Sequence, residues 1–365
     1  MCVQSDPMRR ALELAELGRG YVEPNPMVGC VIVDGVDRIG EGWHRKFGGA
    51  HAEIEALRAA GSRARGATMY VTLEPCCHHG KTPPCTAAII AEGIRRVVVA
   101  QEDPFPAVGG QGIARLREAG IAVEVGLLRD EAEQLNAPYR TLIRKGRPWI
   151  IAKWAMTLDG KIASRARASR WISGETSRRQ VHRLRGLMDA IMVGRETVVR
   201  DDPQLTARPP GPRTPARIVL DRHVALPPSC RLVATSRQIP VIVATGTAPN
   251  TAATARLQEL GCEILTCAGT SPEERLRSLC KELGRRRMSN VLVEGGAEVF
   301  GTLHDARLID EIHVFVAPKL VGGRDAVSAF GGTGSQFIPK NSSLIDPVVE
   351  ILDKDVYISG RVIYH

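Results

Sequence analysis

Three side chains of the kind that bind transition metals lie within a short stretch of this 365-residue chain. They constrain the fold because all three must meet at one point. His51 opens a His-Ala-Glu motif, Cys76 follows a proline about 25 residues later, and Cys85 completes the set. One imidazole and two thiolates leave the fourth position of a tetrahedral zinc ion for water, whose pKa the metal lowers towards ~7. Glu53 adds a carboxylate that can stay off the metal and move protons. The sequence therefore predicts one zinc ion per chain in an open, water-activating site.

A closed structural zinc site is the main alternative for such a cluster, and it would need four protein ligands, for instance four cysteines. Only three well-spaced ligands are evident, which favours an open catalytic position. Cys77 directly follows a predicted ligand, so we expect its side chain to point elsewhere. The simplest interpretation without metal is that Cys76 and Cys85 are buried thiols and that His51 is a core histidine.

The order of these residues resembles the zinc cytidine and deoxycytidylate deaminase superfamily, except that the usual PCxxC step is stretched over residues 75–85. This long loop is similar to the deaminases of riboflavin biosynthesis, which act on a pyrimidine that carries a ribose phosphate. The insertion adds His78, His79 and Lys81 beside the predicted metal, where cationic donors suit a phosphorylated substrate. We therefore expect His78 and Lys81 to bind substrate.

Two further positions of the first half are candidates for substrate binding. Asn25 lies between two prolines just before an apolar segment. The resemblance makes it a substrate contact, whereas its neighbours alone would equally suit a turn residue. Asp103 lies near the end of a later predicted strand and remains a candidate. Phe105 stands where the family commonly has asparagine, and it cannot make the polar contact of an amide.

Strand-like and helix-like patterns alternate along the whole chain, which predicts an α/β protein. In the first half we expect strands at 28–33, 67–73, 97–100 and 121–125, and helices at 7–18, 51–60, 86–92 and 113–119. That order indicates a three-layer domain. A new apolar strand begins at Pro148, so we place the domain boundary between 1–147 and 148–365. No Gly/Ser-rich or Pro-rich linker separates the two domains.

Charge and composition narrow the possible partners. Residues 1–147 hold 19 Lys and Arg against 18 Asp and Glu, whereas residues 148–365 hold 30 against 22. The basic excess of the second half would suit either nucleic acid or phosphorylated small ligands. Aromatic residues make up 4% of the chain, which argues against stacking platforms for single-stranded nucleic acid. No apolar run approaches a membrane span, no signal peptide is evident, and nine cysteines suit a reducing cytoplasm.

A glycine-rich turn follows an apolar strand within 291–301, whose sequence contains Glu294, Gly295 and Gly296. Glycines between a buried strand and a helix let a phosphate approach the backbone and meet free N–H groups. The complete GxGxxG fingerprint of dinucleotide-binding folds does not occur in the chain. A tight strand–helix turn without a ligand would explain the same residues equally well.

Four segments of the second half together resemble the reductases of the same riboflavin pathway, whose fold is like that of dihydrofolate reductase. These segments are 153–163, 169–173, 193–208 and 291–301. The resemblance implies that a cytidine-deaminase-like domain is followed by a dihydrofolate-reductase-like α/β domain that uses NADPH. It implies that NADP(H) contacts Ala155, Trp171, Thr197, Asp201, Gly295, Gly296, Ala297, Glu298, Val299, Phe300 and Gly301. It further implies that substrate contacts Ser169, Arg185, Leu205, Arg208 and Glu294.

The reaction expected of the second domain is a hydride transfer to the open-chain imine of a sugar. A protein group must transfer a proton as the hydride arrives. Lys153 and Glu294 are the ionisable groups best placed for it on predicted strand ends, so we expect both to be catalytic. Arg185 and Arg208 can each form a bidentate clamp on a phosphate. Ordinary solvated arginines are the alternative for both positions.

The order of the two domains identifies the chain as similar to the bifunctional deaminase–reductases of riboflavin biosynthesis. The resemblance implies zinc-dependent hydrolytic deamination of 2,5-diamino-6-ribosylamino-4(3H)-pyrimidinone 5′-phosphate, followed by NADPH-dependent reduction of the ribosyl chain to ribityl. We accordingly expect a small phosphorylated pyrimidine as partner, no nucleic acid and no membrane, and we leave a homo-oligomer open.

Two other interpretations predict different sequences or activities. A nucleic-acid cytidine or adenosine deaminase with a basic binding domain would interleave aromatic and basic residues in 148–365, where few aromatic residues occur. A protein of the same fold that keeps only one activity is favoured by departures from the family pattern at Phe105, Arg195 and Glu196. Separate assays of the two half-reactions would distinguish these possibilities.

Overall fold

The computed structural model describes residues 2–77, 84–106, 108–337 and 342–365. Contacts within the chain divide it into two compact units, Met1–Gly146 and Arg147–His365, and each unit has its own hydrophobic core. In the described part of the chain, no helix is both long and apolar enough to cross a membrane.

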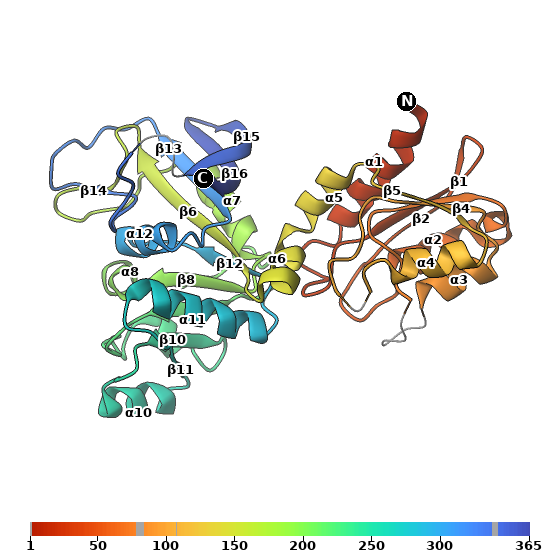
Figure 1. The fold of residues 1–365 in the computed structure, drawn as a ribbon. Coiled ribbons are helices and arrows are strands. Elements are labelled where there is room, and N and C mark those ends of the chain that lie inside the picture. The colour runs from red at the N-terminus through yellow and green to blue at the C-terminus, as the bar shows by residue number, and fades with distance from the viewer. Residues whose placement is uncertain (1, 78–83, 107, 338–341) are drawn as a thin grey trace. The chain divides into compact units, whose positions relative to one another are not determined.

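The first unit is built on a five-stranded sheet (Figure 1). In spatial order its strands are β2 (Asp37–Trp43), β1 (Gly29–Asp34), β3 (Thr68–Val71), β4 (Arg96–Val99) and β5 (Ala122–Val125). The strands β2 and β3 both run antiparallel to β1, whereas β3, β4 and β5 are parallel to one another. Parallel strands end at a common edge, so the segments after β3 and β4 emerge together.

Helices pack on both faces of this sheet because side chains of β1 alternate between them. Cys30 and Ile32 belong to the core beneath one helical layer, and Val31 and Val33 belong to the core beneath the other. The first layer contains α2 (Ala52–Ala60), α3 (Cys85–Ala91) and α4 (Gln111–Glu118), and a 3₁₀ turn, η1 (Gly61–Ala64), follows α2. The second contains α1 (Cys2–Glu16) and α5 (Arg129–Leu135), and α6 (Ala137–Lys145) ends the unit. This confirms the expected three-layer α/β fold.

The strand β2 was missed by the sequence analysis because two glycines interrupt its pattern. A Cβ atom on Gly40 would lie 2.3 Å from the carbonyl oxygen of Ala56, and one on Gly42 would lie 2.4 Å from that of Ala52. Both carbonyls belong to α2, so the glycines let this helix rest directly on β2. Helix α1 also begins earlier than the predicted residue 7.

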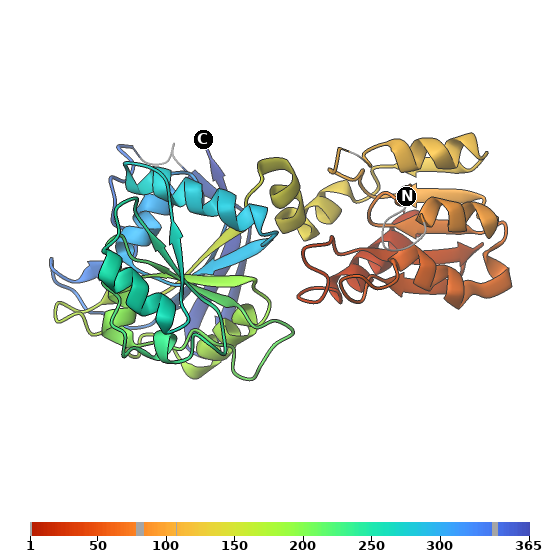
Figure 2. The same cartoon turned by 90° about the horizontal axis from the view of Figure 1, so that it is seen from below.

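The second unit is built on a nine-stranded sheet (Figures 1 and 2). Its spatial order is β11 (Glu263–Thr266), β10 (Val241–Thr245), β9 (Ala216–Leu220), β8 (Ala190–Gly194), β12 (Asn290–Val293), β6 (Trp149–Thr157), β13 (Glu311–Ala317), β16 (Asp355–Tyr364) and β15 (Ser342–Leu352). Every neighbouring pair from β11 to β13 is parallel, and β16 and β15 add an antiparallel edge. A small antiparallel pair, β7 (Lys161–Ala163) and β14 (Val327–Ser328), forms a separate two-stranded sheet.

The helices of this unit are α7 (Glu175–Arg185), α8 (Arg195–Asp201), α9 (Arg231–Ala234), α10 (Thr251–Glu259), α11 (Pro272–Arg285) and α12 (Ala297–Asp305). Leu279 and Leu283 of α11 and Phe300 of α12 are buried in the main core. Helix α11 starts with a complete capping box between Ser271 and Glu274, which fixes its first turn. The outcome is a parallel sheet whose strands β6, β8 and β12 direct their carboxyl ends to one edge, where α/β folds bind ligands.

Candidate functional site

The three predicted metal ligands converge in the first unit. His51 immediately precedes α2, Cys76 lies in the segment that follows β3, and Cys85 is the first residue of α3. Their candidate ligand atoms all lie within 4.8 Å of one another. The Nδ1 atom of His51 is 3.2 Å from Sγ of Cys85 and 3.6 Å from Sγ of Cys76. One imidazole nitrogen and two sulfurs are the donor set of an open zinc site, so these residues fit zinc. Cys77 lies outside the cluster.

Electrostatics around the cluster favour a metal-binding thiolate and a protonatable carboxyl. Hydrogen bonding from the Cys85 side chain lowers the pKa of the Cys76 thiol to about 4. A backbone N–H also donates to this sulfur, from Cys85 at 3.3 Å. Burial raises the pKa of Glu53, whose residue is 3% exposed. Glu53 lies in the first turn of α2, two residues after His51, and is not part of the ligand cluster.

A histidine that the sequence analysis did not single out lies beside the metal cluster. The rings of His44 and His51 meet edge to face with their centroids 5.5 Å apart. The His44 Nδ1 atom lies 3.0 Å from the carbonyl oxygen of Ala50, and its Nε2 atom lies 3.3 Å from the Asn25 amide nitrogen. Asn25 thus reaches the site through His44. Two other predicted substrate residues, His78 and Lys81 of the loop at 75–85, lie outside the described residues.

Asp103 is held in place by the protein. Its Oδ1 atom accepts hydrogen bonds from the backbone N–H of Phe105 and from the hydroxyl of Tyr139, both at 2.9 Å. Its own N–H donates to Glu74, a buried carboxylate that also accepts N–H groups from the start of α4. Phe105 is 41% exposed, so the departure from the family pattern puts an apolar side chain in contact with solvent.

The second unit contains a cavity of about 1560 Å³ at the carboxyl ends of β6, β8 and β12. Single-ligand pockets usually measure ~300–1,000 Å³, so this cavity has room for a dinucleotide and a second ligand. It is lined by nearly all predicted cofactor and substrate residues: Lys153, Ala155, Ser169, Trp171, Arg185, Thr197, Asp201, Leu205, Arg208, Glu294, Gly295, Gly296, Ala297, Glu298, Val299 and Phe300.

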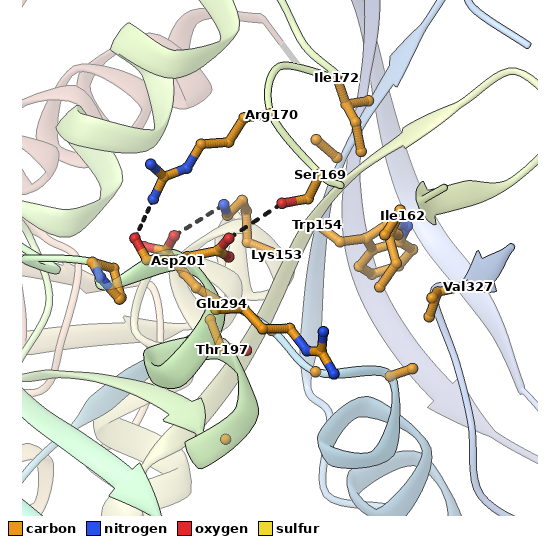
Figure 3. Close-up of a pocket in the computed structure, with 18 of the residues that line it drawn as sticks. Lys153, Trp154, Ile162, Ser169, Arg170, Ile172, Thr197, Asp201, Glu294 and Val327 are labelled. Atoms are coloured by element: carbon orange, nitrogen blue, oxygen red, sulfur yellow. Dashed lines mark hydrogen bonds and ion pairs between the residues drawn. The ribbon is translucent and has the colours of Figure 1, made fainter. Parts of the chain in front are cut away.

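Glu294 is the electrostatic centre of this cavity. Its side chain is only 4% exposed, and it forms an ion pair with Lys153 at 3.0 Å (Figure 3). A second ion pair joins it to Arg185 at 2.5 Å. Val293 pairs with Ala152 across β12 and β6, so Glu294 and Lys153 follow at the same level of the sheet. Burial by itself would raise the pKa of Glu294, but the two cations outweigh burial and hold it well below its usual range. The group is therefore a carboxylate at neutral pH.

Arg185 does not present the free phosphate clamp that the sequence suggested. Its Nε and Nη2 atoms donate to the two carboxylate oxygens of Glu294, and its Nη1 atom donates to the carbonyl oxygen of Thr206 at 3.2 Å. All three nitrogens of the guanidinium are thus engaged within the protein. By contrast, Arg208 is exposed, and its side chain contacts only the neutral residues Gln204 and Thr206 among the described hydrogen bonds.

The mouth of the cavity carries Trp171, whose side chain is largely exposed. The guanidinium of Arg178 lies over its ring, 4.6 Å from the centroid. Ser169 donates a hydrogen bond to Asp201 at 3.3 Å, and Arg170 also contacts Asp201 (Figure 3). These contacts join the 169–173 segment to the end of α8.

The glycine-rich turn connects β12 to α12 and lines the cavity. Gly295 and Gly296 have φ values of 140° and 92°, which L side chains rarely adopt, so only glycine fits without strain. A Cβ on Gly295 would lie 3.5 Å from the hydroxyl of Thr197. The turn thus places backbone without side chains next to α8. Gly301 is not among the residues that line the cavity; it packs against Gly331, and a Cβ there would lie 2.3 Å from the Gly331 backbone.

Comparisons with known proteins match both units. The family model for the cytidine and deoxycytidylate deaminase zinc-binding region matches residues 1–101, and that for the RibD C-terminal domain matches residues 148–351. The riboflavin biosynthesis protein RibD of Actinobacillus pleuropneumoniae is 40% identical over 358 residues, which cover 98% of this chain and 95% of that protein.

Two solved structures are similar over almost the whole chain. Acinetobacter baumannii RibD (form 1) superimposes with a TM-score of 0.85 at 36% identity and covers 98% of both chains. The diaminohydroxyphosphoribosylaminopyrimidine deaminase/5-amino-6-(5-phosphoribosylamino)uracil reductase of Thermotoga maritima superimposes with a TM-score of 0.84 at 37% identity, also over 98% of both chains.

Proposed function

The chain belongs to the family of RibD riboflavin biosynthesis proteins, and from this premise we propose how its residues divide the two reactions. It is a bifunctional enzyme with a zinc-dependent deaminase domain and an NADPH-dependent reductase domain. We assign deamination to residues 1–147 and reduction to residues 148–365. The substrate of the first reaction is the ribosylamino-pyrimidinone 5′-phosphate named above, and its deaminated product is the substrate of the second.

In the deaminase domain, His51, Cys76 and Cys85 would hold the zinc ion. When bound, the ion would supply a water molecule of lowered pKa to the amino-bearing ring carbon. The proposed role of Glu53 is to transfer protons between the attacking water, the ring nitrogen and the leaving ammonia. Its raised pKa supports this role, because a carboxyl that must both accept and release protons works best when its pKa is shifted towards the pH at which the enzyme acts. His44 and Asn25 are candidates to orient the substrate beside it.

In the reductase domain, NADPH supplies the hydride. Lys153 is the proposed proton donor to the imine nitrogen as the hydride reaches the adjacent sugar carbon. Glu294 remains ionised and holds the Lys153 ammonium in place at 3.0 Å. Arg185 fixes the opposite side of the same carboxylate, so its proposed role is to position Glu294. This arrangement keeps the Lys153 ammonium, the proposed proton donor, at the centre of the cavity.

The cofactor and substrate contacts suggested by the resemblance are proposals that the cavity supports. The Gly295–Gly296 turn and the start of α12 suit the pyrophosphate of NADP(H), since the first backbone N–H groups of a helix have no partner within the helix and can bind anions. Arg208 suits the phosphate of the substrate because its side chain has no acidic partner among its described contacts. We propose that the enzyme acts on small phosphorylated pyrimidines and does not bind nucleic acid. Eight free cysteines among the described residues support the cytoplasm as its compartment.

The proposed division is tested by assaying the two half-reactions separately in Glu53→Gln. Deamination should fall by ~10²-fold or more, the usual scale of general acid–base catalysis, while reduction of supplied deaminated substrate stays unchanged. Glu55→Gln is the matched control, because Glu55 lies on the same helix and pairs with Arg58 on the surface. It should affect neither reaction. Wild-type deamination by Glu53→Gln would overturn the assignment.

A further inference from the structure

A histidine in the reductase cavity has no role in the assignments above. His182 lies on α7, one turn before Arg185, and lines the cavity together with Arg208. Residues three apart on a helix share a face, so His182 and Arg185 approach the cavity side by side. The ring is therefore placed where the exposed Arg208 guanidinium offers an anion site.

The hydrogen bonds of His182 leave one ring nitrogen for a ligand. Its Nδ1 atom lies 3.1 Å from the carbonyl oxygen of Thr206 and accepts from the backbone N–H of Arg208 at 3.2 Å in one tautomer. Nδ1 can therefore either accept from Arg208 or donate to Thr206. Among the described residues, Nε2 makes no hydrogen bond. The site thus accommodates a neutral ring and a protonated ring without rearranging the backbone.

The charges around His182 set which form is present before an anion binds. Burial lowers the pKa of His182, and the guanidinium groups of Arg185 on α7 and Arg208 on the adjoining loop lower it further. The hydrogen bond to the Thr206 carbonyl raises the pKa, and so does Glu294 at the end of β12, which is already paired with Arg185 and with Lys153 of β6. The lowering effects prevail, and the pKa of His182 stays below its ordinary value. The ring is neutral at pH 7 in these surroundings.

A bound phosphate would reverse this balance. A phosphate monoester is a dianion above pH ~6, and beside two arginines it would attract a proton to the nearest basic nitrogen. Protonated His182 can donate Nδ1–H to Thr206 and Nε2–H to a phosphate oxygen at the same time. Charge-assisted hydrogen bonds of this kind are roughly twice as strong as neutral ones.

We propose that His182 is part of the substrate-phosphate site of the reductase domain, and that it takes up a proton from solvent when the phosphate binds. Arg208 supplies the permanent charge and His182 the charge that appears on binding. The inference rests on the proposed function, since it takes the substrate to be phosphorylated. It adds a specificity residue that discriminates a phosphorylated sugar from an unphosphorylated one.

The experiment uses the full-length protein with ribose 5-phosphate as the probe. Calorimetric titrations at pH 7.5, in buffers of low and high ionisation enthalpy, count the protons taken up per bound ligand. Wild type should take up a substantial fraction of one proton. His182→Asn should take up none and should bind at least ~10-fold more weakly, as expected for loss of a charge-assisted hydrogen bond. Its side chain can still meet Arg208 or Thr206, which preserves the fold.

Matched measurements separate this role from a structural one. His182→Gln restores a neutral donor near Nε2, so it should recover part of the affinity without recovering proton uptake. His223→Gln changes an exposed histidine outside the cavity and should behave as wild type. In steady state, His182→Asn should raise KM for the phosphorylated substrate and leave kcat nearly unchanged.

Failure of the inference differs from failure of the proposed function. If wild type reduces the phosphorylated substrate but binds ribose 5-phosphate without proton uptake, or if His182→Asn binds it equally well, the inference is wrong while the proposed function stands. If wild type fails to reduce the phosphorylated substrate with NADPH, the proposed function itself is wrong, and the inference is overturned with it.

Discussion

Glu294 shows how one buried residue can organise a whole active site. A carboxylate taken out of water is destabilising unless cations and hydrogen bonds compensate for the lost hydration. Here Lys153 lies on one side and Arg185 on the other, and the Arg185 pair is bidentate. Loss of any one member would leave an uncompensated charge in the cavity, so the three side chains act as a unit.

We predict that Glu294→Gln destabilises the reductase domain in a pH-dependent way. Because the folded-state pKa of Glu294 is lowered below its unfolded value of 4.5, its stabilising contribution is complete above that pH and is lost as the pH falls further. Calorimetric unfolding of wild type and variant should differ by ~3 kcal/mol at pH 7, the scale for breaking a buried pair, and by a smaller amount at pH 3, where the contribution of Glu294 is partly lost. The surface variant Glu263→Gln should cost at most ~1 kcal/mol. A difference between wild type and Glu294→Gln that does not depend on pH would contradict this account.

At the metal site, Cys77 provides an internal control for the proposed ligands Cys76 and Cys85. Cys76 belongs to the ligand cluster and Cys77 does not. We predict that Cys85→Ser loses stoichiometric zinc, whereas Cys77→Ser retains one zinc ion per chain. Zinc content should also fall as the pH is lowered, because thiolate and neutral imidazole ligands compete with protons. Metal analysis after dialysis measures all three. Full zinc content in Cys85→Ser would exclude the assigned ligand set.

Among the secondary-structure elements, the contact between β2 and α2 places the metal-binding helix. Helix α2 carries Glu53 and begins directly after His51, so its height above the sheet fixes both side chains. That height is set by the glycines of β2, whose missing side chains allow backbone contact with the helix. A larger residue there would have to lift the helix or distort the strand.

We predict that Gly42→Val lowers the unfolding free energy of the deaminase domain by ~1–3 kcal/mol, the usual cost of overpacking. Deamination should fall with it because Glu53 moves relative to the metal, while reduction should be unaffected. Val36→Ala is the control in the same hairpin, since Val36 is 89% exposed and its loss should change stability by less than ~0.5 kcal/mol. Equal thermal stability of Gly42→Val and wild type would show that α2 is not seated by this contact.

For the molecule as a whole, two separate cores imply two separable activities. The core beneath α2, α3 and α4 contains only residues of the first unit, and the core around α11 and α12 contains only residues of the second. Among the described residues of the second unit, no cluster of three His, Cys, Asp or Glu ligands occurs. The basic excess also belongs to the second half, where the phosphates of cofactor and substrate are proposed to bind.

We therefore predict that a fragment comprising residues 148–365 retains reductase activity after exhaustive chelation, whereas the full-length protein loses only deamination. Its kcat/KM with NADPH should exceed that with NADH by at least ~10-fold, because basic side chains favour the extra phosphate. Steady-state kinetics with each nucleotide, before and after chelation, measure both effects. Loss of reduction on chelation, or equal use of NADH, would disprove this division of the chain.

Local sequence patterns were sufficient for most of this protein. The His-Ala-Glu motif with its two later cysteines predicted the three side chains that cluster in the fold, because metal coordination restricts residue type and spacing more tightly than packing does. Alternation of strands and helices gave the α/β class, and strong apolar runs located β1, β3 and β4. The strand β2 was not predicted, because its glycines are required by close contact with α2, a helix that follows later in the chain.

Tertiary structure decided what each polar side chain faces. The sequence shows that Arg185 and Arg208 are both arginines of a basic domain, but it cannot show that Glu294 occupies one and leaves the other available. Nor does it reveal that His44 lies against His51, or that Nδ1 of His182 lies within hydrogen-bond distance of the Thr206 and Arg208 backbone. Pairing of charges depends on distances between elements far apart in the chain, and local periodicity carries no information about those distances. Residue types and their order thus determined the chemistry of this protein, and only the packed fold determined which groups are free to carry it out.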